Sequence, residues 1–414
     1  MKLSKFIFSV REGDDITMLN TINGSIIRLS SDEYDSMIHP GDYTNDLVGL
    51  GFLVGDGSDE DADFLESLRT DLLKEDHCCI HILPTTGCNF RCGYCYQSGI
   101  DRSHSFSKDD VHSITESVAR WLEPKSVRTL NLVLHGGEPT LNWPFVEELL
   151  LVFTAMTGSM GIECKIQIVT NGYLLDRGKI DLLTRYDCTR IQLTLDGMRD
   201  IHDSRRPLVN GGPTFDRIIR NIHSILESDY GGRISIRINY DKENLAEVPE
   251  LLEFLATEFD IGRMDLSFGL VTPTLIHIDR EYQEGDDVVQ MYLFLRSEAE
   301  KQGFRFDNIY VHDGFCSAKS RNTIVISPDG HYYKCLSTVG RTDLSCGEIQ
   351  DPIPNTSMTS PDLYRECLGT GCPWVPICHC GCRFESMVSN GEGGRIHCNR
   401  RIVEGINWSL LRPS

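Results

Sequence analysis

Strand-like and helix-like segments alternate along residues 77–285, and this alternation restricts the fold more than any other feature of the sequence. Apolar, β-branched runs predict strands at Cys79–Thr86, Thr129–His135, Glu163–Thr170, Thr189–Leu195, Arg233–Tyr240 and Met264–Leu270. Helical periodicity lies between them, at Ser107–Trp121, Pro144–Thr157, Arg177–Arg185, Thr214–Ser228 and Ala246–Phe259. This order predicts an α/β domain, as a parallel sheet or a partial (β/α)6 barrel. Ligand sites in such folds lie at the C-terminal ends of the strands.

The first 76 residues contain none of the 16 cysteines and are predicted to form a small separate domain. The apolar runs are Lys5–Ser9, Asp15–Asn20 and Ser25–Leu29, with an Asn23-Gly24 turn between the last two. Asn-Gly between apolar runs is a strong hairpin signal. Helices are predicted at Ser31–Ile38, where Ser30 and Glu33 fit a capping box, and at Phe64–Lys74.

Composition excludes several classes of protein. The net charge of −21 argues against a nucleic-acid-binding surface, which requires a basic patch. No apolar run approaches the ~18 residues that span a bilayer, and no secretory signal is visible. We therefore expect a cytoplasmic protein without a membrane partner, whose clustered cysteines bind metal and do not form disulfides.

Three cysteines form a C-x3-C-x2-C motif at Cys88, Cys92 and Cys95, directly after the first predicted strand. Three thiolates suit a cubane iron–sulfur cluster with one iron that has no protein ligand. An open metal position can bind a small chelating molecule, as catalytic zinc sites do. A zinc knuckle, or a ferredoxin-like carrier with a fourth cysteine elsewhere, is the alternative interpretation of these residues alone.

The motif resembles the cluster loop of the radical S-adenosylmethionine (SAM) superfamily, including the aromatic Tyr94 before the third cysteine. The resemblance implies that Cys88, Cys92 and Cys95 hold a [4Fe-4S] cluster and that its open iron binds SAM. Electron transfer to the SAM sulfonium would release a 5′-deoxyadenosyl radical, which abstracts a hydrogen from the substrate. The cofactors would supply this chemistry, and the protein would position them.

Further residues at the strand ends fit the same family. Gly136-Gly137-Glu138-Pro139 follows the second strand and resembles the family's GGEP segment, which binds the SAM amino group. Glycines allow close backbone approach, and Glu138 could accept hydrogen bonds from an ammonium. By the same resemblance, the remaining SAM-binding candidates are Tyr94, Asn171, Thr194 and Arg206. His202 is expected to make a local structural hydrogen bond.

Nine of the 16 cysteines lie beyond Tyr310, where regular helices are expected to be scarce. The spacing there resembles the SPASM domain of peptide-modifying radical SAM enzymes, which holds two auxiliary [4Fe-4S] clusters. The resemblance assigns Cys316, Cys335 and Cys382 to one cluster, and Cys367, Cys372, Cys378 and Cys398 to the other. The turn Ser327-Pro328-Asp329-Gly330 fits a hairpin between Thr323–Ile326 and His331–Lys334. A pair of structural zinc sites is the alternative for this region.

Two departures from the SPASM pattern leave ligands open. The family usually has C-x2-C where this chain has Cys367-x4-Cys372, and Tyr310 stands where related enzymes carry another cysteine. Cys346 is therefore a candidate fourth ligand of the first auxiliary cluster, or that position is open to a substrate thiol. The role of Cys380 is ambiguous. The four other thiols lie on or beside predicted strands, where cysteine acts as a small hydrophobe: Cys78, Cys79, Cys164 and Cys188.

These patterns divide the chain into four parts: a winged-helix-like domain at 1–76, the radical SAM core at 77–285, a bridging helix and linker at 286–310, and the SPASM region at 311–414. The bridging helix is predicted at Tyr282–Gln302. The first part resembles the precursor-recognition domain of peptide maturases, which would bind a leader peptide as an added strand.

The leading hypothesis is a maturase that crosslinks residues of a ribosomally made precursor peptide, through a thioether or a carbon–carbon or carbon–oxygen bond. It would use three [4Fe-4S] clusters, SAM and an external low-potential electron donor. The nearest alternative is a sulfatase-type maturase that forms formylglycine, although Leu336 stands where those enzymes carry an aspartate base. An alternative from another class is a non-catalytic iron–sulfur electron carrier or a zinc protein.

Overall fold

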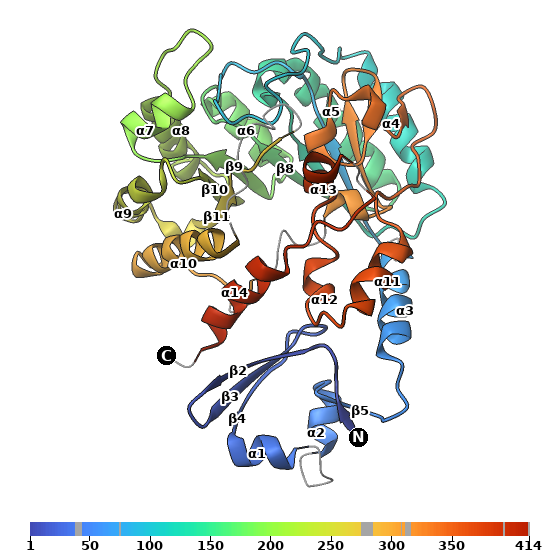
Figure 1. Cartoon of the computed structure of the whole chain (residues 1–414). Coiled ribbons are helices and arrows are strands. Elements are labelled where there is room, and N and C mark those ends of the chain that lie inside the picture. Colours follow the sequence, from blue (N-terminus) through green and yellow to red (C-terminus); the bar gives the residue numbers. More distant parts are fainter. Residues whose placement is uncertain are drawn as a thin grey trace.

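A computed structural model describes residues 1–37, 44–73, 76–274, 285–307, 309–310, 316–391 and 394–412. Three parts are visible in Figure 1: an α/β body at the top, a cysteine-rich tail that runs down its front, and a small N-terminal lobe at the bottom. The predicted helix ends at Ile38 and Lys74, and the predicted start of the bridging helix at Tyr282, lie outside the described residues.

Six parallel strands form the body, in the order in which they occur along the chain. They are β6 (His77–Ile82), β7 (Thr129–Leu134), β8 (Glu163–Val169), β9 (Arg190–Thr194), β10 (Arg233–Tyr240) and β11 (Met264–Leu270). The connecting helices are α4 (Asp110–Leu122), α5 (Trp143–Ser159), α6 (Arg177–Arg185), α7 (Arg199–Arg205), α8 (Phe215–Leu226) and α9 (Val248–Glu258). The predicted α/β class and partial barrel are confirmed.

Local sequence explains these elements. In α8, the apolar residues Phe215, Ile218, Ile222 and Ile225 recur every three or four positions, and all are buried. Helix α4 begins three residues later than predicted, because a turn precedes it, in which the Ser107 backbone N–H and hydroxyl donate to Asp110.

The tail continues the sheet of the body. Strand β12 (Thr323–Ser327) pairs in parallel with β6, and β13 (His331–Tyr333) and β14 (Gly347–Glu348) extend the sheet to nine strands. The predicted hairpin between β12 and β13 is confirmed, and its turn places Gly330 at φ 88°. The first segment of the tail is thus joined to the strand that leads into the C-x3-C-x2-C loop.

From Pro361 on, most of the tail is helical, so the expectation of scarce helices there was wrong. Its helices are α11 (Pro361–Gly369), α12 (Val375–Cys378), α13 (Arg383–Asn390) and α14 (Arg400–Leu411). They are short, and cysteines occupy positions in and beside them, which obscures the apolar period that identifies a helix. Helix α10 (Gly285–Lys301) packs along α14 and connects the body to the tail.

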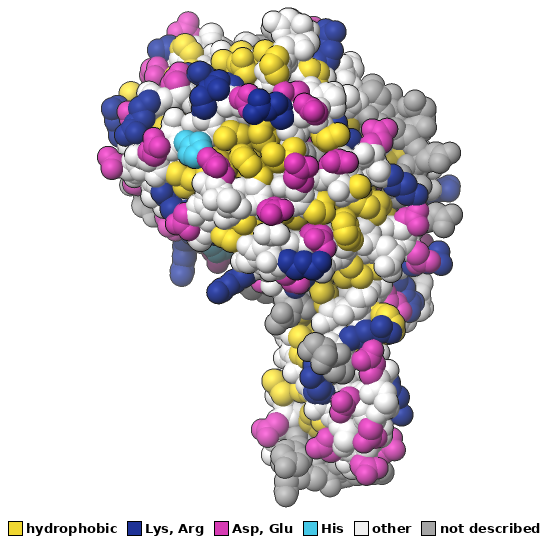
Figure 2. Space-filling view, turned by 90° about the vertical axis from the view of Figure 1, so that its left-hand side faces the viewer, with side chains coloured by type: hydrophobic (Ala, Val, Ile, Leu, Met, Phe, Trp, Pro, Cys, Tyr) yellow, Lys and Arg dark blue, Asp and Glu magenta, His cyan; other side chains and the backbone are white. Residues whose placement is uncertain are grey.

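The N-terminal lobe contains the predicted hairpin as part of a three-stranded antiparallel sheet of β2 (Ile7–Glu12), β3 (Asp15–Asn20) and β4 (Ile26–Ser30). The Ser30–Glu33 capping box is confirmed at the start of α1 (Ser31–Ser36). The other elements are β1 (Lys2–Leu3), which pairs with β5 (Leu53–Val54), α2 (Thr44–Gly49) and α3 (Glu60–Leu73). The lobe projects from the body as a narrow extension (Figure 2).

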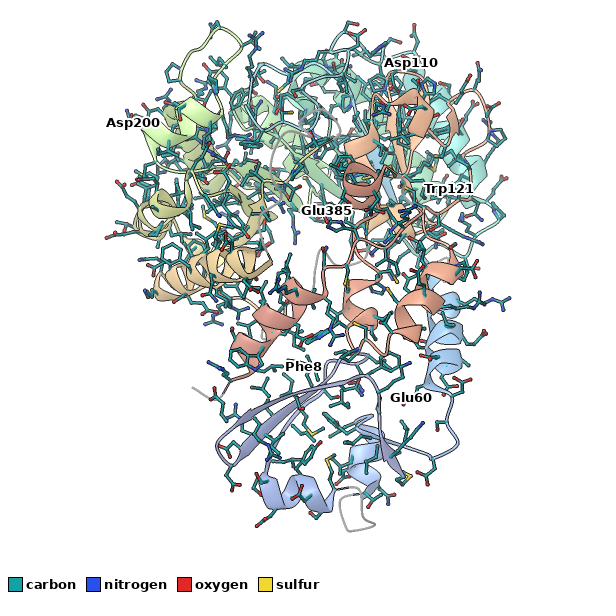
Figure 3. All side chains as sticks on the ribbon, viewed as in Figure 1. Phe8, Glu60, Asp110, Trp121, Asp200 and Glu385 are labelled. Carbon is teal, nitrogen blue, oxygen red and sulfur yellow. The ribbon has the colours of Figure 1, made fainter. Side chains whose placement is uncertain are left out.

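Apolar contacts attach this lobe to the cysteine-rich tail. The ring of Phe8 lies 4.6 Å from that of Trp374, and it projects from β2 toward the tail helices (Figure 3). The ring of Phe64, in α3, lies 5.5 Å from that of Phe6 and 6.4 Å from that of Tyr364 in α11. Over the ranges that the structure describes, no helix is long and apolar enough to cross a membrane.

Candidate active site

A cavity of about 1220 Å³ opens at the C-terminal ends of the body strands. Its wall combines residues from the strand-end loops with residues of the tail. The predicted site residues on this wall are Cys88, Cys92, Tyr94, Cys95, Gly136, Gly137, Asn171, Thr194, Arg206, Cys316, Cys335, Cys382 and Cys398. One cavity therefore brings together most of the predicted SAM-binding residues and four of the predicted auxiliary-cluster ligands.

The loop that carries Cys88, Cys92 and Cys95 is fixed by backbone hydrogen bonds to residues 205–209. The N–H of Arg91 donates to the backbone carbonyl of Pro207 at 2.9 Å, and the N–H of Gly93 donates to the backbone carbonyl of Arg205 at 3.3 Å. Burial raises the pKa of Cys88 to about 12 and also raises that of Cys92. Bound iron would reverse this preference, because a metal ligand must be a thiolate.

The three thiols fit an iron–sulfur cluster better than a single ion. They line a wide cavity, and among the described residues no three Cys, His, Asp or Glu side chains converge closely enough to hold one metal ion. In a [4Fe-4S] cube each iron binds its own thiolate, so the ligands are more widely spaced than those of a single ion. The Arg206 guanidinium beside Cys92 adds positive charge that favours an anionic cluster.

Gly136 and Gly137 allow two backbone segments to cross. A Cβ atom on Gly137 would lie 2.1 Å from the carbonyl oxygen of Gly87, and one on Gly136 would lie 2.6 Å from that of Thr85. Gly136 also has a φ of 139°. The paired glycines were expected to let backbone approach a ligand, and both line the cavity; they also let the β7 loop pass against the backbone that leads into the cysteine motif.

Glu138 departs from the sequence-based expectation. Its side chain is fully buried and is absent from the cavity wall, so it does not face a ligand ammonium. One carboxylate oxygen accepts from the Thr170 hydroxyl at 2.6 Å and from the Thr140 backbone N–H at 3.0 Å. The other accepts from the Asn171 N–H at 2.7 Å. Burial raises the pKa of Glu138, and these hydrogen bonds oppose that shift. The carboxylate therefore links the loop after β7 to the end of β8.

Asn171 and Thr194 reach the cavity from the ends of β8 and β9. The Asn171 amide donates to the side-chain oxygen of Asn89 at 2.8 Å, and the same nitrogen lies 4.0 Å from the Cys88 sulfur. Asn171 therefore braces the cluster loop from the neighbouring strand. Thr194 is mostly buried, with 8% exposure, on the cavity wall.

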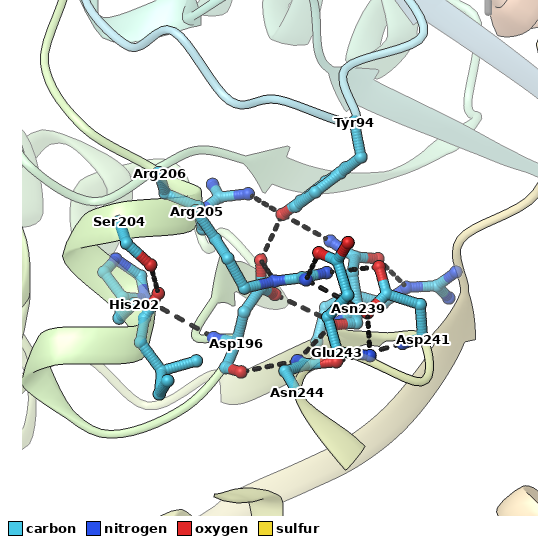
Figure 4. Close-up of polar contacts among 12 residues, drawn as sticks. Tyr94, Asp196, His202, Ser204, Arg205, Arg206, Asn239, Asp241, Glu243 and Asn244 are labelled. Atoms are coloured by element: carbon cyan, nitrogen blue, oxygen red, sulfur yellow. Dashed lines mark hydrogen bonds and ion pairs between the residues drawn. The ribbon is translucent and has the colours of Figure 1, made fainter. Parts of the chain in front are cut away.

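A buried polar network surrounds the hydroxyl of Tyr94 (Figure 4). This hydroxyl donates to Asp196 and accepts from Arg206 at 2.5 Å and from Asn239 at 3.1 Å. Asp196 is fully buried and also accepts from the Asn239 backbone N–H at 3.0 Å. Burial raises the pKa of Asp196, and the charge of Arg206 opposes this shift. The network ties the cluster loop to the ends of β9 and β10.

Sequence reasoning assigned no role to Asp196, Asn239 or Arg205. Arg205 donates to both carboxylate oxygens of Asp241, at 3.1 and 2.9 Å, and its guanidinium lies 5.3 Å from the ring centre of Tyr94. Their positions in the sequence could have indicated a role for Asp196 and Asn239, because both stand at the C-terminal ends of predicted strands, where sites form in such folds. The structural role expected for His202 is confirmed, because its Nδ1 accepts from the Asp196 N–H at 3.3 Å.

The tail thiols divide into two groups. Cys316, Cys335 and Cys382 line the cavity, and so does Cys398, which the sequence analysis assigned to the other cluster. Cys346 does not line it, and its thiol donates to the carbonyl of Tyr332 at 3.3 Å. The structure therefore does not bring Cys346 into the first predicted ligand set. Cys367, Cys372 and Cys378 lie away from the cavity wall, toward the N-terminal lobe.

Cys380 joins this second group. It is 2% exposed, its thiol donates to the carbonyl of Leu363 at 3.6 Å, and Cys367 and Cys372 pack against the same apolar cluster. Cys380 lies in a turn with positive φ of 50°, 64° and 75° at residues 379–381. Such a conformation is costly for residues other than glycine. The turn brings Cys380 beside Cys367 and Cys372, two of the predicted ligands of the second cluster.

Comparison with known proteins identifies the body. The model of the radical SAM superfamily matches residues 82–255. These residues form a radical SAM domain. The match begins at the end of β6, just before the cysteine motif, and ends within α9. Residues 82–255 are thus the radical SAM domain that the sequence predicts, and this superfamily uses a [4Fe-4S] cluster and SAM.

The curated relatives differ in how much of the chain they cover. Fe-coproporphyrin III synthase of Methanosarcina barkeri is 24% identical over 56% of the chain, and the chain spans about half of that protein's length, 54%. The cysteine-type anaerobic sulfatase-maturating enzyme of Clostridium novyi is 22% identical, with 76% of the chain and 90% of the relative covered.

Two solved structures share the fold. Native anSMEcpe with bound AdoMet superimposes with a TM-score of 0.63 at 19% identity, over 80% of this chain and 95% of that chain. SuiB of Streptococcus suis bound to its precursor peptide SuiA has a TM-score of 0.56 at 14% identity. The SuiB match covers 96% of this chain and 99% of that chain, so it includes the N-terminal lobe.

Proposed function

We propose that this protein is a peptide-modifying maturase that crosslinks residues of a ribosomally made precursor peptide. The observation that carries the proposal is the shared cavity, whose wall includes both the C-x3-C-x2-C loop and the tail thiols Cys316, Cys335 and Cys382. At about 1220 Å³ the cavity exceeds the ~300–1,000 Å³ of typical small-molecule sites, which leaves room for a peptide segment beside SAM.

Three [4Fe-4S] clusters are part of this proposal. Cys88, Cys92 and Cys95 would hold the first, Cys316, Cys335 and Cys382 the second, and Cys367, Cys372, Cys378 and Cys398 the third. When bound, SAM and the first cluster supply a 5′-deoxyadenosyl radical that takes hydrogen from the substrate. Arg206 and Tyr94 would hold the cluster loop beside SAM, and Thr194 and Asn171 would contact SAM from the strand ends.

A buried lysine supports thiolate ligands in the tail. Lys334 is 3% exposed, and its ammonium donates to the carbonyls of Ser320, at 2.7 Å, and Thr323. In the described part of the chain no carboxylate lies within 4.0 Å of it. Burial lowers the pKa of Lys334 to about 8, and the nearby Cys346 and Cys316 oppose the shift. A buried cation needs a nearby anion, and a thiolate-bound cluster would provide one.

The N-terminal lobe would bind the leader of the precursor. Its sheet has two edges, and α14 lies against β2, where Arg412 pairs with Glu12 at 2.8 Å. The edge strand β4 is exposed or half-buried at every position. An extended peptide can add to such an edge through main-chain hydrogen bonds. This supports leader binding along β4.

Formylglycine formation is the second candidate, because the Clostridium novyi relative spans most of the chain. Leu336 argues against it. It lies on the cavity wall immediately after Cys335, where a sulfatase-type maturase would need an aspartate base. Oxidation of a serine or cysteine also needs no leader-binding lobe.

The decisive experiment is an anaerobic reaction of the iron-reconstituted protein with SAM, a reductant and candidate precursor peptides encoded near its gene. Crosslinking predicts a product lighter by two hydrogens per link, and fragmentation maps the linked residues. The variant with Cys88, Cys92 and Cys95 replaced by alanine is the control and should leave the peptide unchanged. SAM cleavage without any change in peptide mass would contradict crosslinking, and a formylglycine product would favour the second candidate.

A further inference from the structure

Lys319 connects the two groups of tail thiols. It ends the short 3₁₀ helix Ser317–Lys319, and its backbone N–H donates to the carbonyl of Cys316 at 2.9 Å. Its side-chain ammonium donates to the carbonyl of Cys378 at 3.4 Å. Cys316 belongs to the cavity-lining group and Cys378 to the deeper group, so the backbone of this lysine bonds to one group and its ammonium to the other.

This lysine is buried without a carboxylate partner. It is 6% exposed, and within the ranges that the structure describes no Asp or Glu oxygen lies within 4.0 Å of its ammonium. The Ser357 hydroxyl donates to the Lys319 carbonyl at 2.8 Å and fixes the backbone. Burial lowers the pKa of Lys319, while Cys316 and Cys378 oppose this shift. The anions available to this cation are therefore the cysteine ligands themselves.

We propose that Lys319 is a positioning residue whose charge, held between the Cys316 and Cys378 groups, raises the reduction potentials of both auxiliary clusters. The inference rests on the proposed presence of these clusters. A reduced cluster with its thiolates is more negative than the oxidised one, so a fixed positive charge favours reduction. Because the ammonium is buried, solvent and salt screen it little. A single side chain would thus shift both clusters together.

The test uses the full chain with Cys88, Cys92 and Cys95 replaced by alanine, so that only auxiliary clusters contribute to the spectra. Potentiometric titration followed by electron paramagnetic resonance compares Lys319, Lys319→Met, Lys319→Gln and Lys319→Arg. The Lys319→Met and Lys319→Gln variants should lower the ratio of reduced to oxidised cluster about tenfold at a fixed solution potential. This corresponds to a reduction potential lower by about 59 mV for a one-electron couple. Arg, which keeps the charge, should stay within about threefold of Lys.

Lys301→Met is the matched control, because Lys301 is 62% exposed and pairs with Glu298 at the surface. It should leave both potentials unchanged. Unchanged potentials in Lys319→Met and Lys319→Gln, with iron retained, would overturn the inference. If both neutral variants lose iron, the iron content of Lys319→Arg distinguishes the two explanations. Iron retained in Lys319→Arg would show that the positive charge is required, and iron lost from it would show that Lys319 only fills space.

The same samples separate this inference from the proposed function. Two auxiliary cubanes require about eight irons per chain in the alanine background. Markedly less iron with Lys319 in place would contradict the auxiliary clusters and the inference with them. Full iron with no crosslinked peptide from the wild-type protein would contradict the crosslinking proposal and leave the inference standing.

Discussion

Single residues at the strand ends hold the cluster loop in place, and they do so through contacts with protein. Glu138 accepts from Thr140, Thr170 and Asn171, and Asp196 accepts from Tyr94 and Asn239. Both carboxylates are fully buried. Their removal should therefore disturb the geometry of the site before it changes any direct contact with a ligand.

Gly137→Ala should prevent assembly of the first cluster. The added methyl group would lie 2.1 Å from the carbonyl oxygen of Gly87, so the cluster loop must move. Iron should fall by about four atoms per chain, from about twelve to about eight, and SAM cleavage should be lost. Gly158→Ala, where a Cβ meets nothing within 4 Å, is the control. Wild-type iron and SAM cleavage in Gly137→Ala would contradict this account of the glycine pair.

Tyr94→Phe should destabilise the metal-free protein by about 1–3 kcal/mol, because it removes the phenol that joins Asp196 to Arg206 inside the body. Urea unfolding measures the loss. In a double-mutant cycle with Asp196→Asn, the two changes should be non-additive by at least ~0.5 kcal/mol. Strict additivity would show that the two side chains do not interact energetically.

Acid should weaken the fold through His135. Burial lowers the pKa of His135 to about 4, and its Nδ1 accepts from the Gly136 N–H at 2.7 Å. An exposed histidine has a pKa of about 6.5, so between these values the unfolded chain binds a proton that the folded chain does not. The free energy of unfolding should fall from pH 6.5 toward pH 4, by up to ~1.4 kcal/mol per pH unit from this residue. His135→Asn should flatten that slope, and an unchanged slope would exclude His135 as its source.

Elements of the tail connect the other two parts of the molecule. Strand β12 lies beside β6 in the body sheet, and α11 and α12 receive the rings of the N-terminal lobe. Phe64, in α3, packs between Phe6 and Tyr364 with 9% exposure. The docking of the lobe thus depends on helices that also carry Cys367 and Cys378.

Phe64→Ala should cost about 3–5 kcal/mol in the stability of this junction. Limited proteolysis should then cut between the lobe and the body faster, while the body stays resistant. Phe294→Ala, at a position with 40% exposure, is the control and should leave the cutting rate unchanged. Equal cutting rates for all three proteins would show that the Phe64 contact does not hold the lobe.

For the whole molecule, local patterns predicted the architecture and the place of the site. Alternating apolar periods predicted six strands and their helices, and the C-x3-C-x2-C spacing predicted a cysteine loop after the first strand. What the sequence could not show depends on contacts between distant segments. Tyr94 meets Asp196 across 102 positions, and Thr21 meets Pro373 across 352. The orientation of Glu138 away from the cavity also depends on distant residues, because Thr170 and Asn171 hold its carboxylate.

The pairing of β6 with β12 has a consequence for how the chain is made. About 240 residues separate these neighbouring strands. A ribosome adds roughly 5–20 residues per second, so β12 is synthesised roughly 10–50 s after β6, and until then the edge of β6 has no paired strand. During that interval the nascent body exposes an apolar strand edge beside the cysteine loop, and such edges pair readily with other chains. Slow translation before Thr323 should therefore lower the yield of folded protein more than slow translation after Tyr333.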